Sequence, residues 1–328
     1  MRNLTGKNVA LIVPKYFNYE ASIQSELEMR GAVVFRIYEN VEEVNYLYRI
    51  VYRYFPSKRD KLMDKYYKKY INSLPEKIDL IFVIRGSSVT EETMRLFHKK
   101  YPQSHFIMYQ WDSVKNNPRA YEIAKYFDHV YTFDNIDATT LGWIYRPLFY
   151  TSEDTNVPKD IDISYVCSIH SERIQILNKL KSLCSNKKFK LYTYVYSNKL
   201  IYYKRKYLAK VPEYQMAEDS DIKFKPLRTD DTIRIYQRSN IVVDYTNPNQ
   251  TGFTMRTIEC LGNRCKLVTN NNDVKNADFF NDQNIYVYDG LNLNIPDSFI
   301  TSPYVSLSNE LYKYYSLSGW LDFLLETI

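Results

Sequence analysis

The chain has 328 residues, which is enough for two α/β domains that each bury their own core. The net charge of +6 is mild, and without a recognisable nucleic-acid-binding module it argues against a nucleic-acid-binding protein. No apolar run reaches membrane-spanning length and the N-terminus lacks a secretory signal, so we expect a cytoplasmic protein. The four cysteines lack metal-binding spacing and are expected to be free thiols: Cys167, Cys184, Cys260 and Cys265.

The first half of the chain alternates buried strands with helices. Strands are expected at residues 8–14, 32–38, 78–84, 105–109 and 129–133. Gly31 ends the first helix, and Thr90 with the two following glutamates begins a later one. Polar residues follow most strands directly, a pattern typical of a parallel sheet wound with helices.

A second alternating series follows an irregular stretch between Pro147 and Lys159. Its strands are expected at residues 162–168, 188–196, 241–243, 266–269 and 284–288. A last helix, residues 317–328, has Trp320, Phe323 and Leu324 on one face. We therefore predict domains at residues 1–150 and 151–316, followed by this C-terminal helix.

The most informative stretch runs from Ser239 to Asn272. A short β-branched strand ends at Asp244, the turn-forming residues 247–252 follow, and a helix begins near Thr254. In open α/β sheets this edge binds ligands, and a helix N-terminus there suits a phosphate. Arg256 and Glu259 lie three residues apart on one helix face. The guanidinium suits a phosphate and the carboxylate suits sugar hydroxyls.

Residues 251–263, TGFTMRTIECLGN, resemble the nucleotide-sugar-binding motif of glycosyltransferases with the GT-B fold. The resemblance implies two facing Rossmann-like domains with parallel sheets and a last helix that packs back on the first domain. It also implies that Glu259 binds the ribose of the donor. Thr251 departs from the family, where this position is often acidic. The spacing of Arg256 and Glu259 resembles bacterial transferases of lipopolysaccharide and capsular polysaccharide assembly.

The resemblance extends to the first loop of the second domain, where Ser171 and Arg173 stand at the start of a helix. GT-B enzymes contact the donor diphosphate at this place, although a plain helix cap fits the residues equally well. The expected donor-binding residues are Ser171, Arg173, Asp244, Thr251, Gly252, Thr254, Arg256 and Glu259.

The first domain is expected to supply a base that accepts the proton of the acceptor hydroxyl. Asp112, at the end of a strand, is the first candidate, Glu20 the second and Asp134 the third. For each of them singly, a cap or a turn is the commoner role. Trp111 and Arg85 are expected to contact the acceptor, through stacking on a sugar ring and through charge.

Two basic stretches, residues 49–69 and 173–210, remain. The first interleaves lysines with tyrosines and resembles a helix that lies on an anionic membrane, although a solvated helix face is at least as common. Asp219 and Asp221 form an Asp-x-Asp pair of the kind that binds metals, but they lie in a poorly patterned region. We therefore expect no metal and no cofactor.

Together these features predict a glycosyltransferase of surface-glycan assembly that moves a sugar from a nucleotide-sugar donor to a saccharide acceptor. Both a free and a lipid-linked saccharide are considered as the acceptor. A sugar-nucleotide epimerase on the same scaffold and a non-catalytic nucleotide-sugar-binding protein are the alternatives. The fold does not choose between them, because function lies in the site.

Overall fold

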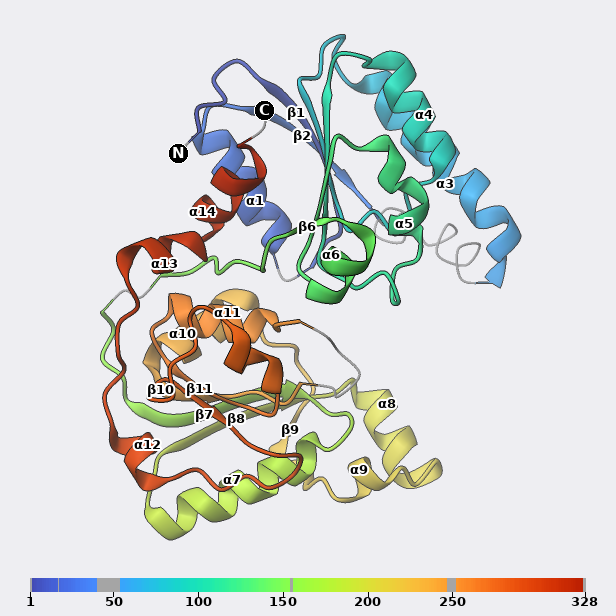
Figure 1. Cartoon of the computed structure of the whole chain (residues 1–328). Coiled ribbons are helices and arrows are strands. Elements are labelled where there is room, and N and C mark those ends of the chain that lie inside the picture. The colour runs from blue at the N-terminus through green and yellow to red at the C-terminus, as the bar shows by residue number, and fades with distance from the viewer. Residues whose placement is uncertain (1, 17, 40–53, 154–155, 247–251, 327–328) are drawn as a thin grey trace. The chain divides into compact units, whose positions relative to one another are not determined.

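The computed structural model of the protein describes residues 2–16, 18–39, 54–153, 156–246 and 252–326 (Figure 1). Contacts divide the chain into two units, Met1–Leu148 with Leu317–Ile328 and Phe149–Ser316. Each unit contains a six-stranded sheet, and in the described part of the chain all neighbouring strands of the two sheets pair in parallel. The α/β class with parallel sheets, predicted from the alternating pattern, is confirmed.

The sheet of the first unit has the strand order β2-β1-β3-β4-β5-β6. Its strands are β1 (Asn8–Val13), β2 (Val33–Tyr38), β3 (Leu80–Ile84), β4 (His105–Gln110), β5 (His129–Thr132) and β6 (Ile144–Tyr145). The helical segments are α1 (Tyr19–Met29), α3 (Pro56–Ser73), α4 (Glu91–Lys100), α5 (Arg119–Ile123), η2 (Ala124–Tyr126), α6 (Asn135–Leu141) and α14 (Leu317–Leu324). The order reverses between β1 and β3, which gives this sheet a switch point.

The C-terminal helix α14 is part of the first unit's core. Trp320 is fully buried, and its ring centroid lies 4.7 Å from that of Tyr109 and 6.0 Å from that of Phe82. Arg30, at the end of α1, donates to Asp322 of α14 at 2.7 Å. An apolar ring therefore attaches this helix to β3 and β4, and an ion pair attaches it to the end of α1, all more than two hundred residues earlier in the chain.

Two tyrosines of helix α3 lie in the protein core and not on a membrane-facing surface. One of two interpretations of residues 49–69 placed the tyrosines at the headgroups of a bilayer, but Tyr66 and Tyr67 are buried and pack with Met63 and Ile71 in the core of the first unit. The apolar face of α3 is therefore covered by protein, and that interpretation is wrong for these two tyrosines. Residues 49–53, which begin the same basic stretch, lie outside the described residues.

The sheet of the second unit has the strand order β12-β11-β10-β7-β8-β9. Its strands are β7 (Ile161–Ser168), β8 (Leu191–Tyr196), β9 (Ile222–Lys223), β10 (Ser239–Val243), β11 (Lys266–Thr269) and β12 (Ile285–Val287). The longer helices are α7 (Arg173–Lys187), α10 (Thr229–Arg238) and α11 (Met255–Gly262), and shorter ones are α8 (Lys199–Tyr203), η3 (Lys204–Leu208), α9 (Pro212–Gln215), η4 (Asp219–Asp221), η5 (Asn272–Asn276), α12 (Asp297–Thr301) and α13 (Asn309–Tyr314). The order reverses between β7 and β10.

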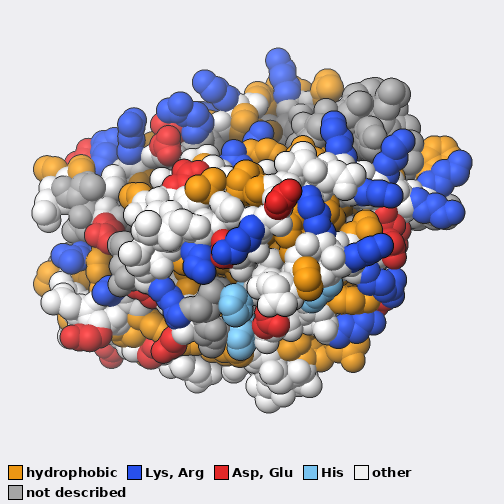
Figure 2. Space-filling model, turned by 90° about the horizontal axis from the view of Figure 1, so that it is seen from above, with side chains coloured by type: hydrophobic (Ala, Val, Ile, Leu, Met, Phe, Trp, Pro, Cys, Tyr) orange, Lys and Arg blue, Asp and Glu red, His pale blue; other side chains and the backbone are white. Residues whose placement is uncertain are grey.

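Charged side chains of both signs share the surface. On the face drawn in Figure 2, Lys and Arg side chains are spread among acidic and hydrophobic ones. Among the described residues, no helix is long and apolar enough to cross a membrane. The chemistry of the molecule must therefore be sought in particular clusters and not in its overall charge.

Candidate functional site

The carboxyl ends of β7 and β10 meet at the switch point of the second unit. These neighbouring strands pair in parallel, with Ile241 opposite Ile163. The loop after β7 leads into α7, and the loop after β10 leads into α11. Two helix N-termini therefore begin at the edge where ligands bind in open α/β sheets.

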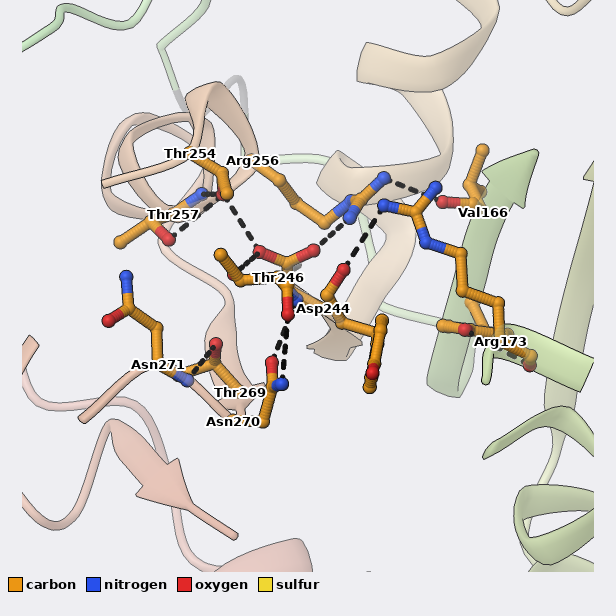
Figure 3. Close-up of polar contacts among 12 residues, drawn as sticks. Val166, Arg173, Asp244, Thr246, Thr254, Arg256, Thr257, Thr269, Asn270 and Asn271 are labelled. Carbon is orange, nitrogen blue, oxygen red and sulfur yellow. Dashed lines mark hydrogen bonds and ion pairs between the residues drawn. The ribbon is translucent and has the colours of Figure 1, made fainter. Parts of the chain in front are cut away.

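Asp244, the residue after β10, is the centre of the polar contacts drawn in Figure 3. Its side chain is buried, and its Oδ2 accepts hydrogen bonds from the hydroxyls of Thr254 at 2.8 Å and Thr246 at 3.2 Å. Its Oδ1 pairs with the guanidinium of Arg256. Asp244 therefore ties the end of the strand to the first turn of α11.

The guanidinium of Arg256 faces into the unit. Its Nε donates to the hydroxyl of Tyr236 at 3.0 Å, and its Nη2 donates to the carbonyl of Val166 at 2.8 Å. With the Asp244 contact, each of its three nitrogens has a protein partner, and Figure 3 shows the contacts to Asp244 and Val166. Burial raises the pKa of Tyr236 to about 12, so this hydroxyl stays neutral. Arg256, predicted as a phosphate ligand, thus also joins β7, α10 and α11.

Arg173 begins α7 on the other side of the switch point. Its Nη2 donates to the carbonyl of Tyr245 at 3.1 Å, while its buried Nε has no hydrogen-bond partner among the described residues. Ser171, two residues earlier, has a positive φ of 51° and its hydroxyl lies 3.2 Å from Nδ1 of His170. Burial, with Arg173 and Arg256 nearby, lowers the pKa of His170.

The charges at this edge balance. Arg173 and Arg256 are matched by Asp244 and by Glu172, whose carboxylate accepts a hydrogen bond from Tyr245 at 2.5 Å. An anion bound here would gain little from net charge. It would depend on donors with defined directions, which are guanidinium N–H groups, hydroxyls and helix N-termini.

The remaining predicted donor residues lie near the start of α11. Thr254 caps this helix, because its hydroxyl accepts the N–H of Thr257 at 3.2 Å. Gly252 has a φ of 77°, and its carbonyl accepts a hydrogen bond from Asn271 at 3.0 Å. Glu259 is buried and accepts from the N–H and the hydroxyl of Thr151 at 3.2 and 3.1 Å. Thr251 lies outside the described residues.

Neither carboxylate of the Asp-x-Asp pair is isolated. Asp219 pairs with Lys206, and Asp221 pairs with Lys181 at 2.8 Å. Among the described residues, no group of His, Cys, Asp and Glu has the arrangement of a metal site. The acidic pair therefore serves the surface of this unit as ion-pair partners.

The first unit gathers other predicted residues at its own carboxyl edge. Arg85 follows β3 with a φ of 70°, and its Nε lies 2.9 Å from Oδ2 of Asp112, which follows β4. The ring of Trp111 lies 6.4 Å from that of Tyr16, in the loop after β1. Burial and the charge of Asp112 raise the pKa of Tyr16. Predicted base and predicted acceptor residues thus form one cluster, which we call the Arg85–Asp112 cluster.

Glu20 and Asp134 have structural partners. Glu20 is buried, and its carboxylate accepts the N–H of Tyr16 at 3.2 Å. Asp134 caps α6, since its Oδ1 accepts the N–H groups of Ile136 at 2.8 Å and Asp137 at 3.2 Å. Both carboxylates thus hold loop or helix backbone, and Asp112 is the more exposed of the three candidates.

Glu39 was not singled out from the sequence. It follows β2, is fully buried, and accepts the N–H of Ser88 at 3.1 Å, while its Oε2 has no hydrogen-bond partner among the described residues. Burial raises its pKa, and the nearby charge of Arg85 opposes that shift. Its place directly after a predicted strand was the available signal.

The two all-parallel sheets and their edge sites define a protein of the GT-B fold class. No family model and no curated protein sequence matches the chain. The solved structure of HepE from Anabaena, in complex with UDP and glucose, matches with 11% identity over 98% of this chain and 99% of HepE, at a TM-score of 0.60.

Two further solved structures match over nearly the whole chain. A glycosyltransferase from Rickettsia africae ESF-5 has 13% identity, covers 98% of this chain and 88% of its own, and gives a TM-score of 0.52. A UDP-GlcNAc 2-epimerase from Neisseria meningitidis, bound to UDP-GlcNAc, has 8% identity. The match covers 98% of this chain and 99% of the epimerase, at a TM-score of 0.56. The predicted fold is therefore confirmed, and the scaffold serves both transferases and epimerases.

Proposed function

We propose that the protein is a glycosyltransferase that moves a sugar from a nucleotide-sugar donor to a saccharide acceptor. A UDP-sugar is the first donor to test, because HepE and the Neisseria epimerase were solved with UDP-containing ligands. The proposal includes a role in cell-surface glycan assembly, with a saccharide acceptor that is free or carried on a lipid.

The observation that carries the proposal is the buried Nε of Arg173, which has no hydrogen-bond partner among the described residues. A buried N–H without an acceptor costs about 1–3 kcal/mol of stability. Such a group in a folded protein is explained if a ligand supplies the acceptor. This Nε lies at the switch point, on the first residue of a fifteen-residue helix. A diphosphate oxygen supplies the missing acceptor and gains from the helix N-terminus.

In this proposal the second unit binds the donor. Arg173 and Ser171 bind the diphosphate and stabilise its charge as it leaves, and Glu259 binds the ribose hydroxyls. Arg256 holds the end of β10 against α11 through its ion pair with Asp244. Asp244, Thr254 and Gly252 shape the loop around them, together with Thr251. No metal or cofactor takes part, because guanidinium groups and helix N-termini perform the electrostatic work.

The first unit contributes the acceptor side of the reaction. Asp112 takes the proton of the attacking hydroxyl, and Glu20 is the second candidate for this base. Arg85 holds the Asp112 carboxylate in place through their 2.9 Å ion pair, and Trp111 offers an aromatic face to a sugar ring.

An epimerase is the rival function, favoured by the epimerase match at a TM-score of 0.56. A transferase needs an acceptor, whereas an epimerase converts its nucleotide-sugar without one. A binding protein without turnover would consume no donor under either condition.

The test is to incubate the purified protein with UDP-glucose or UDP-GlcNAc, with and without mixed oligosaccharide acceptors, and to quantify UDP and sugar products. The proposal expects UDP release that depends on acceptor and falls at least about a hundredfold in Asp112→Asn. Arg234→Ala, which removes an exposed cation from α10, is the control. Conversion of the donor without acceptor would establish the epimerase instead.

A further inference from the structure

Exposed apolar side chains gather on one short segment of the second unit. Along α8 and η3 the exposed fractions of the side chains are high: Leu200 83%, Ile201 47%, Tyr203 39%, Tyr207 57% and Leu208 80%. Scattered apolar residues on a surface are normal, but a continuous group of them marks an interaction site. We call this group, with the cations among it, the α8 surface.

The segment is held firmly by its opposite side. Tyr202 is fully buried, lies 5.7 Å from the ring of Phe224 and donates its hydroxyl to Asp219 at 2.7 Å. Tyr214, in α9, is also buried and donates to the carbonyl of Ile169 at 3.3 Å. Because these tyrosines fix the segment to the core, the exposure of Leu200 and Leu208 is built into the fold.

Cations alternate with the apolar side chains. Lys199, Lys204, Arg205 and Lys210 are exposed, and residues 199–210 contain no acidic residue. Helix α8 lies at the edge of the second unit, near the edge strand β9 (Figure 1). The segment therefore offers aliphatic tips, aromatic rings and positive charge together at a sheet edge.

We propose that the α8 surface binds an anionic lipid bilayer. Leucine and isoleucine tips enter the acyl boundary, tyrosines lie at headgroup depth, and lysines meet the lipid phosphates. The cores of protein–protein interfaces are depleted in lysine, so the same mixture suits a second protein poorly. The proposal concerns a surface and does not depend on the transfer reaction.

The experiment is co-sedimentation of the purified full chain with vesicles of phosphatidylcholine, with or without phosphatidylglycerol. We expect binding to the anionic vesicles that weakens as salt is raised, because salt screens the charges. Leu200→Ser with Leu208→Ser should weaken this binding about tenfold, since both tips leave water on insertion. Replacing Lys199, Lys204 and Lys210 by Gln should abolish the preference for anionic lipid.

Matched controls distinguish binding through the α8 surface from nonspecific binding through other exposed side chains. Met29→Ser with Ile136→Ser removes apolar side chains that are 69% and 58% exposed in the first unit, and binding should not change. A second control replaces three exposed lysines elsewhere by Gln: Lys99, Lys115 and Lys275. Thermal unfolding of each variant confirms that it is folded.

Two results would overturn the proposal. One is an absence of binding to anionic vesicles, or binding that the paired serine variant leaves intact. The other is a protein that does not bind vesicles but self-associates in light-scattering measurements, with the self-association abolished by the paired serine variant. That result would make the α8 surface a contact between copies of the chain.

Discussion

Asp244 and Arg256 form an ion pair on which three segments of the second unit depend. The side chains are only 1% and 18% exposed, so removal of one charge leaves the other buried and unpaired. Asp244→Asn should therefore lower the free energy of unfolding by about 3 kcal/mol, measured by urea denaturation. Asp231→Asn, at the exposed pair with Arg228, should cost about 0.5 kcal/mol or less. Equal losses in the two variants would contradict this account.

His170 should make stability depend on pH. Burial and two nearby arginines lower its pKa in the folded state, so below its ordinary value the unfolded chain binds more protons than the folded chain. The stability from this neutral histidine is present above about pH 6.5 and is lost as the pH falls below that value. From pH 8 to pH 5.5, the wild-type protein should lose more stability in urea than His170→Gln. Parallel losses would mean that His170 titrates normally in the folded protein.

The principal charged residues of the candidate site could be predicted from the sequence, but their partners could not. Asp244, Arg173 and Arg256 were found because polar residues after a strand and cations at a helix start follow from periodicity and chain order. Periodicity does not determine where a long side chain turns, and Arg256 bonds inward to Val166 and Tyr236. These partners lie twenty and ninety residues away from Arg256 in the chain. Local sequence patterns do not indicate contacts over such separations.

At the scale of elements, strands with continuous apolar runs were the easiest to predict. The predicted residues 78–84 enclose β3, whose five residues are all buried. The predicted strand at residues 188–196 begins later, at Leu191, because α7 continues to Lys187 and ends at Lys188 with a φ of 58°. Helix α8 was not predicted, since its five residues are too few to show the apolar pattern of an amphipathic helix, and α9 has only four residues.

Gly262 is the last residue of α11, where a glycine often stops a helix through its positive φ. Here the positive φ of 44° belongs to Arg264, so the glycine has another cause. A Cβ on Gly262 would lie 2.5 Å from the carbonyl oxygen of Ser152 and 2.5 Å from Cγ of Tyr150. The residue is glycine because another segment packs directly against it.

Gly262→Ala should therefore reduce the free energy of unfolding by about 2 kcal/mol, because the methyl group forces Tyr150 or the helix to move. Thermal and urea unfolding measure this loss. Gly142→Ala serves as the comparison, since its added methyl group meets nothing within 4 Å and reports backbone strain alone at a φ of 70°. A smaller loss at Gly262 than at Gly142 would refute the packing explanation.

At the scale of the whole molecule, the chain forms two units, and its last residues belong to the first. Trp320→Ala should remove about 3–5 kcal/mol from the stability of that unit, because a fully buried ring leaves a cavity beside Phe82 and Tyr109. Hydrogen exchange followed by mass spectrometry should show lost protection in β3 and β4, with β7 and β10 unchanged. Loss of protection in both units alike would show that they do not unfold separately.

We propose that the second unit binds a nucleotide diphosphate at the switch point between β7 and β10. The most direct measurement is calorimetric titration with UDP, then GDP, CMP, dTDP and ADP, of the wild-type protein, Arg173→Ala and Arg234→Ala. The account predicts that one nucleotide binds, that Arg173→Ala weakens it at least about tenfold, and that Arg234→Ala leaves it unchanged. If no nucleotide binds to the folded protein, or if Arg173→Ala binds as tightly as wild type, the account is contradicted.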